Sequence, residues 1–273
     1  MMENSRRNFL KIAGISALGI GFTQPVLNAY GASEEQGKAA KPQTMRGQNV
    51  KTAKQWGMVI DTRRFTSKAD VEPIIEACHK FHNVPDFKNR PDIPENVAKR
   101  HEIKWIWEEE YKHVFPGNDV TYLNDRVKEI PFLVLCNQCA NPSCVRACPT
   151  KATFKREDGI VLMDFHRCIG CRFCMAACPY GSRSFNFRDP RPFIHEVNPA
   201  FPTRMKGVVE KCNFCAERLE VGLMPKCVEA SQGAMAFGDL EDPNSIVRKL
   251  LQSNYTIQRK PALGTRPSVY YIV

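Results

Sequence analysis

Apolar and polar residues alternate from Ala152 to Asp164, with Glu157-Asp158-Gly159 near the centre of the segment. Alternation places every second side chain on one face of a strand, and Asp-Gly is a frequent turn dipeptide in hairpins. The segment therefore predicts a β-hairpin. Trp105 and Trp107 are also two residues apart, which predicts a strand with both rings on one face, in the core or at a subunit interface.

An apolar stretch near the start of the chain runs from Ile12 to Phe22, between Ser5-Arg6-Arg7-Asn8-Phe9-Leu10-Lys11 and Pro25. It is short for a membrane span, and a basic, then apolar, then polar order is typical of an export signal. The paired arginines resemble a twin-arginine signal, which implies export of an already folded protein. An amphipathic first helix is the alternative, and an uncleaved signal would anchor the chain to the membrane.

Length and composition indicate a chain that buries a core. Its 273 residues are 43% hydrophobic and 25% charged, as in one large domain or two fused small ones. We assign residues 1–32 to the signal and 33–55 to a linker, because Gly31 to Gln55 is polar and rich in Lys, Gln, Ala and Glu. Residues 56–273 remain for the folded domain. No later stretch approaches the roughly 18 apolar residues of a membrane span.

Cysteine is the most informative residue type. Eleven of the twelve cysteines lie between Cys136 and Cys227, and Cys78 stands alone upstream. The segment Cys168-Ile169-Gly170-Cys171-Arg172-Phe173-Cys174, with Cys178-Pro179, matches the C-x2-C-x2-C-x3-C-P pattern of bacterial ferredoxins. In that pattern three thiolates bind one 4Fe-4S cluster and the fourth binds the neighbouring cluster. We expect this fourth cysteine at the start of a helix.

A second cysteine motif precedes the hairpin and differs in spacing. Cys136, Cys139, Cys144 and Cys148-Pro149 have two extra residues before the third cysteine. If the fourth cysteine of each motif binds the cluster of the other motif, two sets of cluster ligands are predicted. They are cluster A, with Cys136, Cys139, Cys144 and Cys178, and cluster B, with Cys168, Cys171, Cys174 and Cys148. Two such motifs joined by a hairpin form the supersecondary unit of a two-cluster ferredoxin.

The same unit recurs elsewhere in the chain with some of its cysteines replaced. Cys212-Asn213-Phe214-Cys215 repeats the form of Cys136-Asn137-Gln138-Cys139. Cys227-Val228-Glu229-Ala230-Ser231 repeats Cys144-Val145-Arg146-Ala147-Cys148, with serine in place of the fourth cysteine. This second copy of the unit, which we call the outer repeat, has therefore lost one cysteine ligand in its downstream part.

The upstream part of the outer repeat has lost the complementary ligands. Asp61 precedes Phe65 by four residues, as Asp164 precedes Cys168, and Cys78 is the surviving fourth cysteine. Pairing as in the inner unit predicts cluster C, with Cys212, Cys215, Cys227 and Cys78.

Three complete sites would use all twelve cysteines. A fourth site, at Ser231 and the region of Phe65, would have lost all its ligands together.

Other uses of these cysteines remain open from the residues alone. Structural zinc also takes closely spaced cysteines, although a third cysteine two residues on is unusual there. Disulfides suit an exported protein, but cysteines this crowded cannot all pair without strain. Cys78 is alternatively a buried thiol, which would leave the third site open or with a three-iron cluster. His166 and Arg167 either tune the cluster beside Cys168 or belong to a solvated loop.

The formal net charge of +10 raises the question of nucleic acid or an anionic membrane surface as partner. Twelve thiolates around three cluster cores of about +2 contribute roughly −6, which leaves the loaded chain near +4. Much of the basicity therefore balances bound cofactor, and we expect no nucleic-acid partner.

Signatures of other chemistry are absent from the sequence. No C-x-x-C is followed by histidine, so no covalent haem site is expected. Gly14, Gly19 and Gly21 lie inside the signal and do not form a dinucleotide fingerprint. No nucleophile and base stand together among the six histidines, so we predict no catalytic residue and no small-molecule substrate.

The cysteine layout, the twin-arginine signal and the tail Pro267-Ser268-Val269-Tyr270-Tyr271 resemble four-motif iron–sulfur subunits of the dimethyl sulfoxide reductase and NrfC type, over about residues 55–273. Cys168 through Phe193 and Lys211 through Ser245 are similar to the DsrO family, the periplasmic iron–sulfur subunits of Dsr complexes. Such subunits usually bind four clusters. Phe65 and Ser231 depart from this family pattern, because they stand where ligands of a fourth cluster would be expected.

The resemblance implies an α+β fold of tandem bacterial-ferredoxin-like halves with pseudo-two-fold symmetry and an extended C-terminal tail. The inner unit would span about 131–190, and the outer unit about 56–90 and 205–240. It implies single-electron transfer between a quinone-active membrane subunit of the NrfD type and a c-type cytochrome subunit, in the periplasm, coupled to dissimilatory sulfite and sulfur metabolism. The alternative is an electron-transfer subunit of a molybdenum reductase or hydrogenase.

Overall fold

The computed structural model describes residues 50–273 except 89 and 118–121. The predicted signal, residues 1–32, and most of the predicted linker lie outside the described residues. Residues 50–55, the end of that linker, contain no helix or strand. The first strand begins at Trp56.

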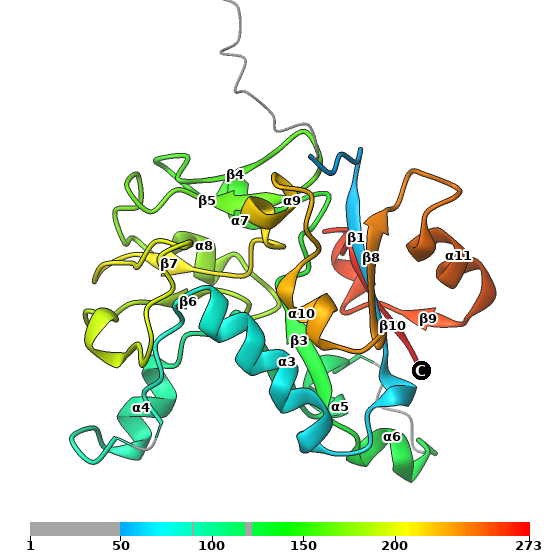
Figure 1. The fold of residues 1–273 in the computed structure, drawn as a ribbon, viewed down its shortest axis with the longest axis horizontal. Helices are drawn as coiled ribbons and strands as arrows, with labels where there is room; N and C mark the ends of the chain where they lie inside the picture. The colour runs from blue at the N-terminus through cyan, green and yellow to red at the C-terminus, as the bar shows by residue number, and fades with distance from the viewer. Residues whose placement is uncertain (1–49, 89, 118–121) are drawn as a thin grey trace, which may run out of the picture. The chain divides into compact units, whose positions relative to one another are not determined.

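A four-stranded mixed sheet joins the two ends of the folded domain (Figure 1). Its strands, in the order β8-β1-β10-β9, are β8 (Met235–Asp239), β1 (Trp56–Asp61), β10 (Val269–Ile272) and β9 (Thr256–Ile257). Strand β1 pairs in parallel with β10 and antiparallel with β8. The C-terminal tail therefore supplies a central strand of this sheet.

The two faces of this sheet follow the alternation of its residues. Met58 and Ile60 of β1 face the main hydrophobic core. Val59, on the opposite face, packs with Ile272 and with Val247 of helix α11 (Ile246–Ser253). Side chains with a period of two thus bury both faces, one against the core and one under a helix.

Three further strand pairs are antiparallel. They are β2 (Ile106–Glu109) with β3 (Phe132–Leu135), β4 (Thr153–Lys155) with β5 (Val161–Met163), and β6 (Ser184–Phe185) with β7 (Val209–Glu210). The pair β4–β5 is the hairpin predicted from Ala152 to Asp164, and Gly159 in its turn has a φ of +85°, a conformation that favours glycine. The predicted hairpin is confirmed.

Most helices of the described chain are short. They are α4 (Glu95–His101), α5 (Tyr111–Val114), α6 (Asp125–Glu129), α7 (Ser143–Arg146), α8 (Phe173–Ala176), α9 (Ala216–Leu219) and α10 (Lys226–Ala230), with 3₁₀ turns η1 (Thr62–Arg64), η2 (Arg191–Phe193) and η3 (Pro261–Leu263). Helix α3 (Lys68–Phe81) is the longest, and it begins with a capping box between Ser67 and Asp70. Its buried residues Val71, Ile74 and Cys78 follow a helical spacing, which places Cys78 on the face toward the core.

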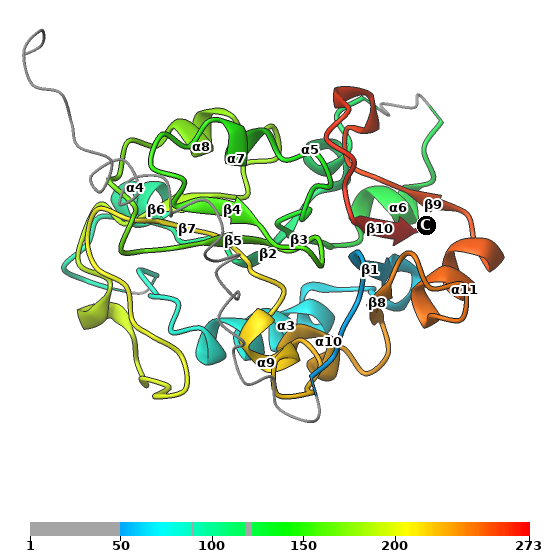
Figure 2. The ribbon, with the colours of Figure 1, turned by 90° about the horizontal axis from the view of Figure 1, so that it is seen from above.

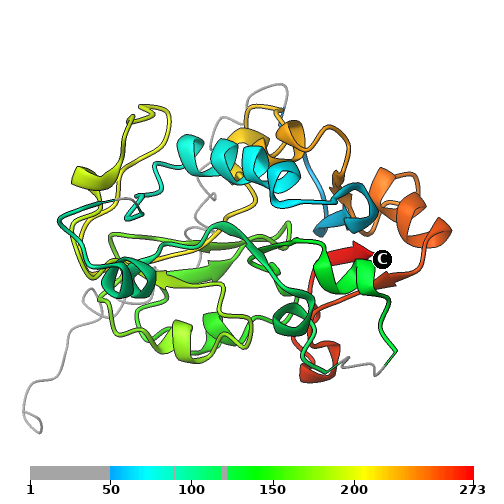
Figure 3. The ribbon, with the colours of Figure 1, turned by 90° about the horizontal axis from the view of Figure 1, so that it is seen from below.

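The cysteine-bearing segments lie on two sides of the short strands. Helices α7 and α8 lie on one side, and α3, α9 and α10 lie on the other (Figures 2 and 3). Helices α3 and α10 are in contact, although they are far apart in the chain. In the part of the chain that the structure describes, no helix combines the length and apolarity that a bilayer crossing requires.

Strand β2 contains Trp107 but begins at Ile106, so the prediction that both rings lie on one strand is wrong for Trp105. Trp105 is buried in the core, where its indole nitrogen donates a hydrogen bond of 2.8 Å to Glu210 Oε2. Trp107 is partly buried, and the Lys104 ammonium lies over its ring. The structure is a mixed α and β fold.

Candidate metal centres

The first C-x-x-C pair of each of three motifs, Cys136–Cys139, Cys168–Cys171 and Cys212–Cys215, shares one backbone feature. The residue before the second cysteine has a positive φ in each loop: +44° at Gln138, +71° at Gly170 and +55° at Phe214. A left-handed residue in such a loop turns successive N–H groups toward one concave space, which favours anionic sulfur atoms there. Two of the three are not glycine, so the loop geometry is kept at some conformational cost.

The third cysteines of two motifs also have matching surroundings. Helices α7 and α10 follow Pro142 and Pro225, and Cys144 and Cys227 are each the second helical residue. The repeat read from the sequence therefore corresponds to repeated local structure at these positions.

One expectation about the fourth cysteines is wrong. The sequence predicts Cys178 at the start of a helix, but it follows the C-cap Ala177 of α8. Cys148 likewise follows the C-cap Ala147 of α7. A single-turn helix carries the third cysteine, and the proline after the fourth cannot continue that helix because it lacks the N–H donor.

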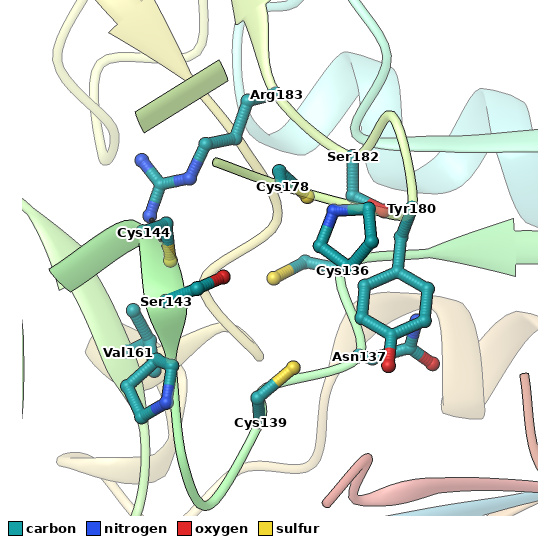
Figure 4. Close-up of a pocket in the computed structure, with 12 residues that line it drawn as sticks. Cys136, Asn137, Cys139, Ser143, Cys144, Val161, Cys178, Tyr180, Ser182 and Arg183 are labelled. Carbon is teal, nitrogen blue, oxygen red and sulfur yellow. Dashed lines mark hydrogen bonds between the residues drawn. The ribbon is translucent and has the colours of Figure 1, made fainter. Parts of the chain in front are cut away.

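Set A comprises the thiols of Cys136, Cys139, Cys144 and Cys178, which line one cavity (Figure 4). Their sulfur atoms face a common space, and they come from the loop before α7, from α7 itself and from the segment after α8. Burial raises the pKa of Cys139 to about 12, and the neighbouring Cys136, Cys144 and Cys178 add to that effect. Four crowded thiols resist ionisation unless a positive group binds among them.

Arg183 contacts set A directly. Its guanidinium Nη2 donates to Cys144 Sγ at 3.0 Å and to Thr153 Oγ1 at 2.7 Å, and the residue is buried. Figure 4 shows the guanidinium reaching toward Cys144. A buried cation at this position favours the anionic form of the sulfur ligand.

Set B comprises the thiols of Cys168, Cys171, Cys174 and Cys148. Cys174 lies close enough to Cys148 and Cys168 to interact electrostatically, and burial raises its pKa. Burial opposes ionisation of Cys148, but N–H groups of Thr153, Thr150 and Ala152 and the Thr150 hydroxyl outweigh it and lower its pKa. Cys171 is partly buried in the same loop as Cys168.

Set C comprises the thiols of Cys78, Cys212, Cys215 and Cys227, all of them buried. Burial raises the pKa of Cys78 well above its ordinary value, and Cys227, Cys215 and Cys212 add to the effect in that order. The thiol of the isolated upstream cysteine thus lies among the other three.

Two backbone N–H donors and the side chains of His82 and Glu217 lie beside the thiols of set C. The N–H of Phe214 donates to Cys212 Sγ at 3.5 Å, and that of Lys226 donates to Cys215 Sγ at 3.4 Å. His82 Nδ1 lies 3.6 Å from Cys78 Sγ, and ligand atoms of His82, Cys215 and Glu217 lie within 4.8 Å of one another. Hydrogen bonds of this kind stabilise thiolates at a metal centre.

The expected position of a fourth site has no cysteine. Phe65 and Ser231 line one cavity together with Arg64, Ala69, Asp70, Pro73, Ala230, Gln232 and Ala234. Phe65 belongs to the hydrophobic core. The Ser231 hydroxyl donates to Val228 O at 2.7 Å and accepts from the Met235 N–H at 3.0 Å. Both residues have taken structural roles.

Comparison with known proteins identifies the family. Residues 129–189 match the model of the 4Fe-4S dicluster domain. The chain is 39% identical to Hdr-like menaquinol oxidoreductase iron-sulfur subunit 1 of Archaeoglobus fulgidus, over 98% of this chain and 97% of that protein. The chain belongs to this family of iron–sulfur subunits.

Two other relatives widen the comparison. The chain is 35% identical to the menaquinone reductase iron-sulfur cluster-binding subunit of Nitratidesulfovibrio vulgaris, over 80% of this chain and 88% of that protein. It is 44% identical to a tetrathionate reductase subunit of Salmonella typhimurium, over 50% of both sequences. These relatives confirm that the chain is an iron–sulfur electron-transfer subunit, as predicted, with 4Fe-4S clusters as cofactors.

The side chains of this iron–sulfur subunit fit such clusters. Asn137 lines the cavity of set A and is buried, yet neither its amide nitrogen nor its amide oxygen has a hydrogen-bond partner. A cluster sulfide is an acceptor for such an amide. All twelve cysteines lie in the described residues as free thiols, so the structure gives no support to a disulfide framework.

Sequence reasoning missed the polar residues that surround the thiols. Arg183 and His82 gave no signal in the sequence, because neither stands inside a cysteine motif. Lys211 directly precedes Cys212, which was the one available clue. His166 and Arg167, the residues that the sequence suggests instead, are exposed, and Arg167 pairs with Asp164, so the solvated-loop alternative holds for their side chains.

Proposed function

We propose that this subunit holds three 4Fe-4S clusters and passes single electrons within a membrane-bound quinone oxidoreductase complex. The observation that supports the proposal is that the thiol of Cys78 lies among those of Cys212, Cys215 and Cys227, while four other thiols of two motifs line one cavity.

The proposed ligands follow the exchange of fourth cysteines between motifs. Set A would hold cluster A, set B would hold cluster B, and set C would hold cluster C. When bound, each cluster supplies a site that takes up and releases one electron. The chain's own residues hold the clusters, exclude water from set C and place donors on the thiolates. On this proposal the inner and outer units are tandem ferredoxin-like halves.

The partners are inferred from the named relatives. Two long matches are subunits of a menaquinol oxidoreductase and a menaquinone reductase, which supports a menaquinone-linked membrane subunit as one partner. Within this role we place the subunit in the periplasm, between a membrane subunit of the NrfD type and a c-type cytochrome subunit. In its most specific form, the proposal is that the complex serves sulfite and sulfur metabolism, as Dsr complexes do.

A second candidate is the electron-transfer subunit of a molybdenum reductase. It is favoured by the tetrathionate reductase subunit and by a component of the polysulfide reductase of Wolinella succinogenes, which is 40% identical over 50% of this chain. These matches cover half of the chain, whereas the quinone-linked relatives extend along most of it. The first candidate therefore accounts for more of the sequence.

The test is reduction of the native complex, purified anaerobically, with a water-soluble menaquinol analogue. We expect the broad visible absorption of the clusters to bleach and reduced-state EPR signals to appear. Dithionite reduction of the same sample gives the total signal for comparison. Reduction by dithionite but not by the quinol analogue would contradict the quinone-linked role. A large molybdenum-containing subunit in the purified complex, in place of haem and membrane proteins, would support the second candidate.

A further inference from the structure

Two cationic side chains are buried among the three thiol sets. Arg183 is 5% exposed and Lys211 is 2% exposed. Burying a cation is costly unless partners compensate it. The partners of these two residues lie at the places where neighbouring sets adjoin.

Arg183 connects set A with set B. Its Nη2 donates both to Cys144 Sγ, at 3.0 Å, and to Thr153 Oγ1, at 2.7 Å. The N–H of Thr153 is in turn hydrogen-bonded to Cys148 of set B. The guanidinium also lies close enough to Cys174 of set B to interact electrostatically. One buried charge therefore faces thiols of both sets.

Lys211 connects set A with set C. Its Nζ donates to the carbonyl oxygens of Val161 and of Cys212, the latter at 2.8 Å. Val161 lines the cavity of set A, and Cys212 belongs to set C. Gln138, in the loop of set A, donates through Nε2 to the same Cys212 carbonyl at 2.8 Å. Lys211 therefore lies at the junction between these two sets.

These contacts also give an order for the three sets. Set A adjoins set B through Arg183 and adjoins set C through Lys211, so set A is the middle member. Cys212 of set C lies within electrostatic reach of Cys136 of set A, which agrees with that order.

We propose that Arg183 and Lys211 are positioning residues that place one positive charge at each junction of the order B–A–C and together raise the reduction potential of the middle cluster. This inference rests on the proposed function. Added electrons make a cluster more negative, and a nearby buried cation stabilises that form because the local dielectric constant is low. Both cations act on cluster A, whereas clusters B and C each adjoin one of them. Cluster A would therefore be the most strongly favoured to accept an electron.

The test is an EPR-monitored redox titration of the full-length subunit and of Arg183→Gln and Lys211→Met. Iron and acid-labile sulfide are measured first in every sample, so that a change in potential is not confused with loss of a cluster. The charge-retaining variants Arg183→Lys and Lys211→Arg accompany them. Arg167→Gln is the matched control, because Arg167 is also near a cysteine motif but its side chain is 66% exposed and paired with Asp164.

We expect one and the same EPR signal to move to lower potential in both neutral variants. At a fixed applied potential its ratio of reduced to oxidised cluster should fall about tenfold, which is about 59 mV for one electron. The signal of cluster C should stay in place in Arg183→Gln, because Arg183 adjoins only sets A and B. The signal of cluster B should stay in place in Lys211→Met, because Lys211 adjoins only sets A and C. The charge-retaining variants and Arg167→Gln should stay near the wild type.

Unchanged potentials in fully loaded variants would overturn the inference, as would the absence of any signal that shifts in both neutral variants. A shift in Arg183→Lys as large as that in Arg183→Gln would overturn the role of charge. If a neutral variant does not fold, its charge-retaining partner still tests the inference, because a shifted potential in that variant would contradict the role of charge. Fewer than three clusters in the wild type would instead count against the proposed function, independently of these shifts.

Discussion

His82 Nε2 lies 3.0 Å from Glu217 Oε1, beside the thiols of set C. The imidazole is 1% exposed and stacks on Trp105 with ring centroids 4.3 Å apart. Its other nitrogen, Nδ1, lies 2.9 Å from the carbonyl oxygen of Cys78. A single buried ring thus joins the end of α3, which carries Cys78, to α9, which follows Cys215.

Replacement of His82 by alanine should destabilise the subunit. The change removes a partner of Glu217 and opens a cavity against Trp105. We expect a loss of roughly 2–3 kcal/mol, below the value for a fully buried pair because Glu217 is 28% exposed and partly hydrated. Thermal unfolding under anaerobic conditions measures it. His113→Ala is the matched control, since His113 forms an exposed pair with Glu109. Equal effects of the two variants would contradict the role given to His82.

The buried pair of Arg204 and Glu210 gives a second stability prediction. Arg204 Nη2 lies 2.8 Å from Glu210 Oε2, and both side chains are fully buried. Glu210 also accepts hydrogen bonds from Trp105 and Asn186. Glu210→Gln leaves the guanidinium without its counter-charge, which should cost about 3–5 kcal/mol.

The control for that substitution is Glu76→Gln, which breaks the exposed pair of Glu76 with Lys80. We expect a change of less than about 1 kcal/mol there. The midpoint of thermal unfolding, measured for both variants in the same buffer, tests the comparison. A small effect of Glu210→Gln would show that the buried pair contributes little to the core.

His79 predicts a pH dependence of stability. Burial lowers its pKa to about 4, and its Nε2 lies 3.0 Å from the carbonyl oxygen of Ile106, so the folded protein holds the neutral ring. The unfolded chain takes up a proton near pH 6.5, so it carries more protons than the folded chain between these values. Stability should therefore fall as pH decreases from about 6.5 toward 4, by roughly 1–2 kcal/mol at pH 5.

The check is unfolding of the wild type and of His79→Gln between about pH 7.5 and pH 5, a range chosen to avoid acid damage to clusters. The glutamine variant keeps a donor for Ile106 but does not titrate. The difference in stability between the two ends of this range should be smaller in the variant. Identical pH profiles would rule out His79 as the titrating group.

Ser231→Cys tests whether the fourth site is lost. The substitution restores a cysteine at the position that corresponds to Cys148, but Phe65 and the other residues of that cavity supply no thiol. A single thiolate does not hold a 4Fe-4S cluster. We expect the iron content per chain to stay unchanged by metal analysis. A gain of roughly four iron atoms would mean that the site is still competent.

Features that depend on local spacing could be predicted from the sequence. The hairpin and the repeated C-x-x-C loops follow from residues that are close in the chain or related by the repeat. The long-range polar contacts were not predictable in this way. Lys211 with Val161 and His82 with Glu217 depend on segments that meet only after folding. The helix position of Cys178 was wrong because one turn of helix ends before its proline rather than beginning there.

The most direct test of the account is iron and acid-labile sulfide per chain in the anaerobically purified, full-length subunit. Three 4Fe-4S clusters predict about twelve of each, and Cys78→Ala should reduce the iron to about eight if the third site is left open, or to about eleven if it keeps a three-iron cluster. A wild-type value near eight that Cys78→Ala leaves unchanged would contradict the third cluster. A stably folded, colourless protein that contains zinc in place of iron would contradict all three.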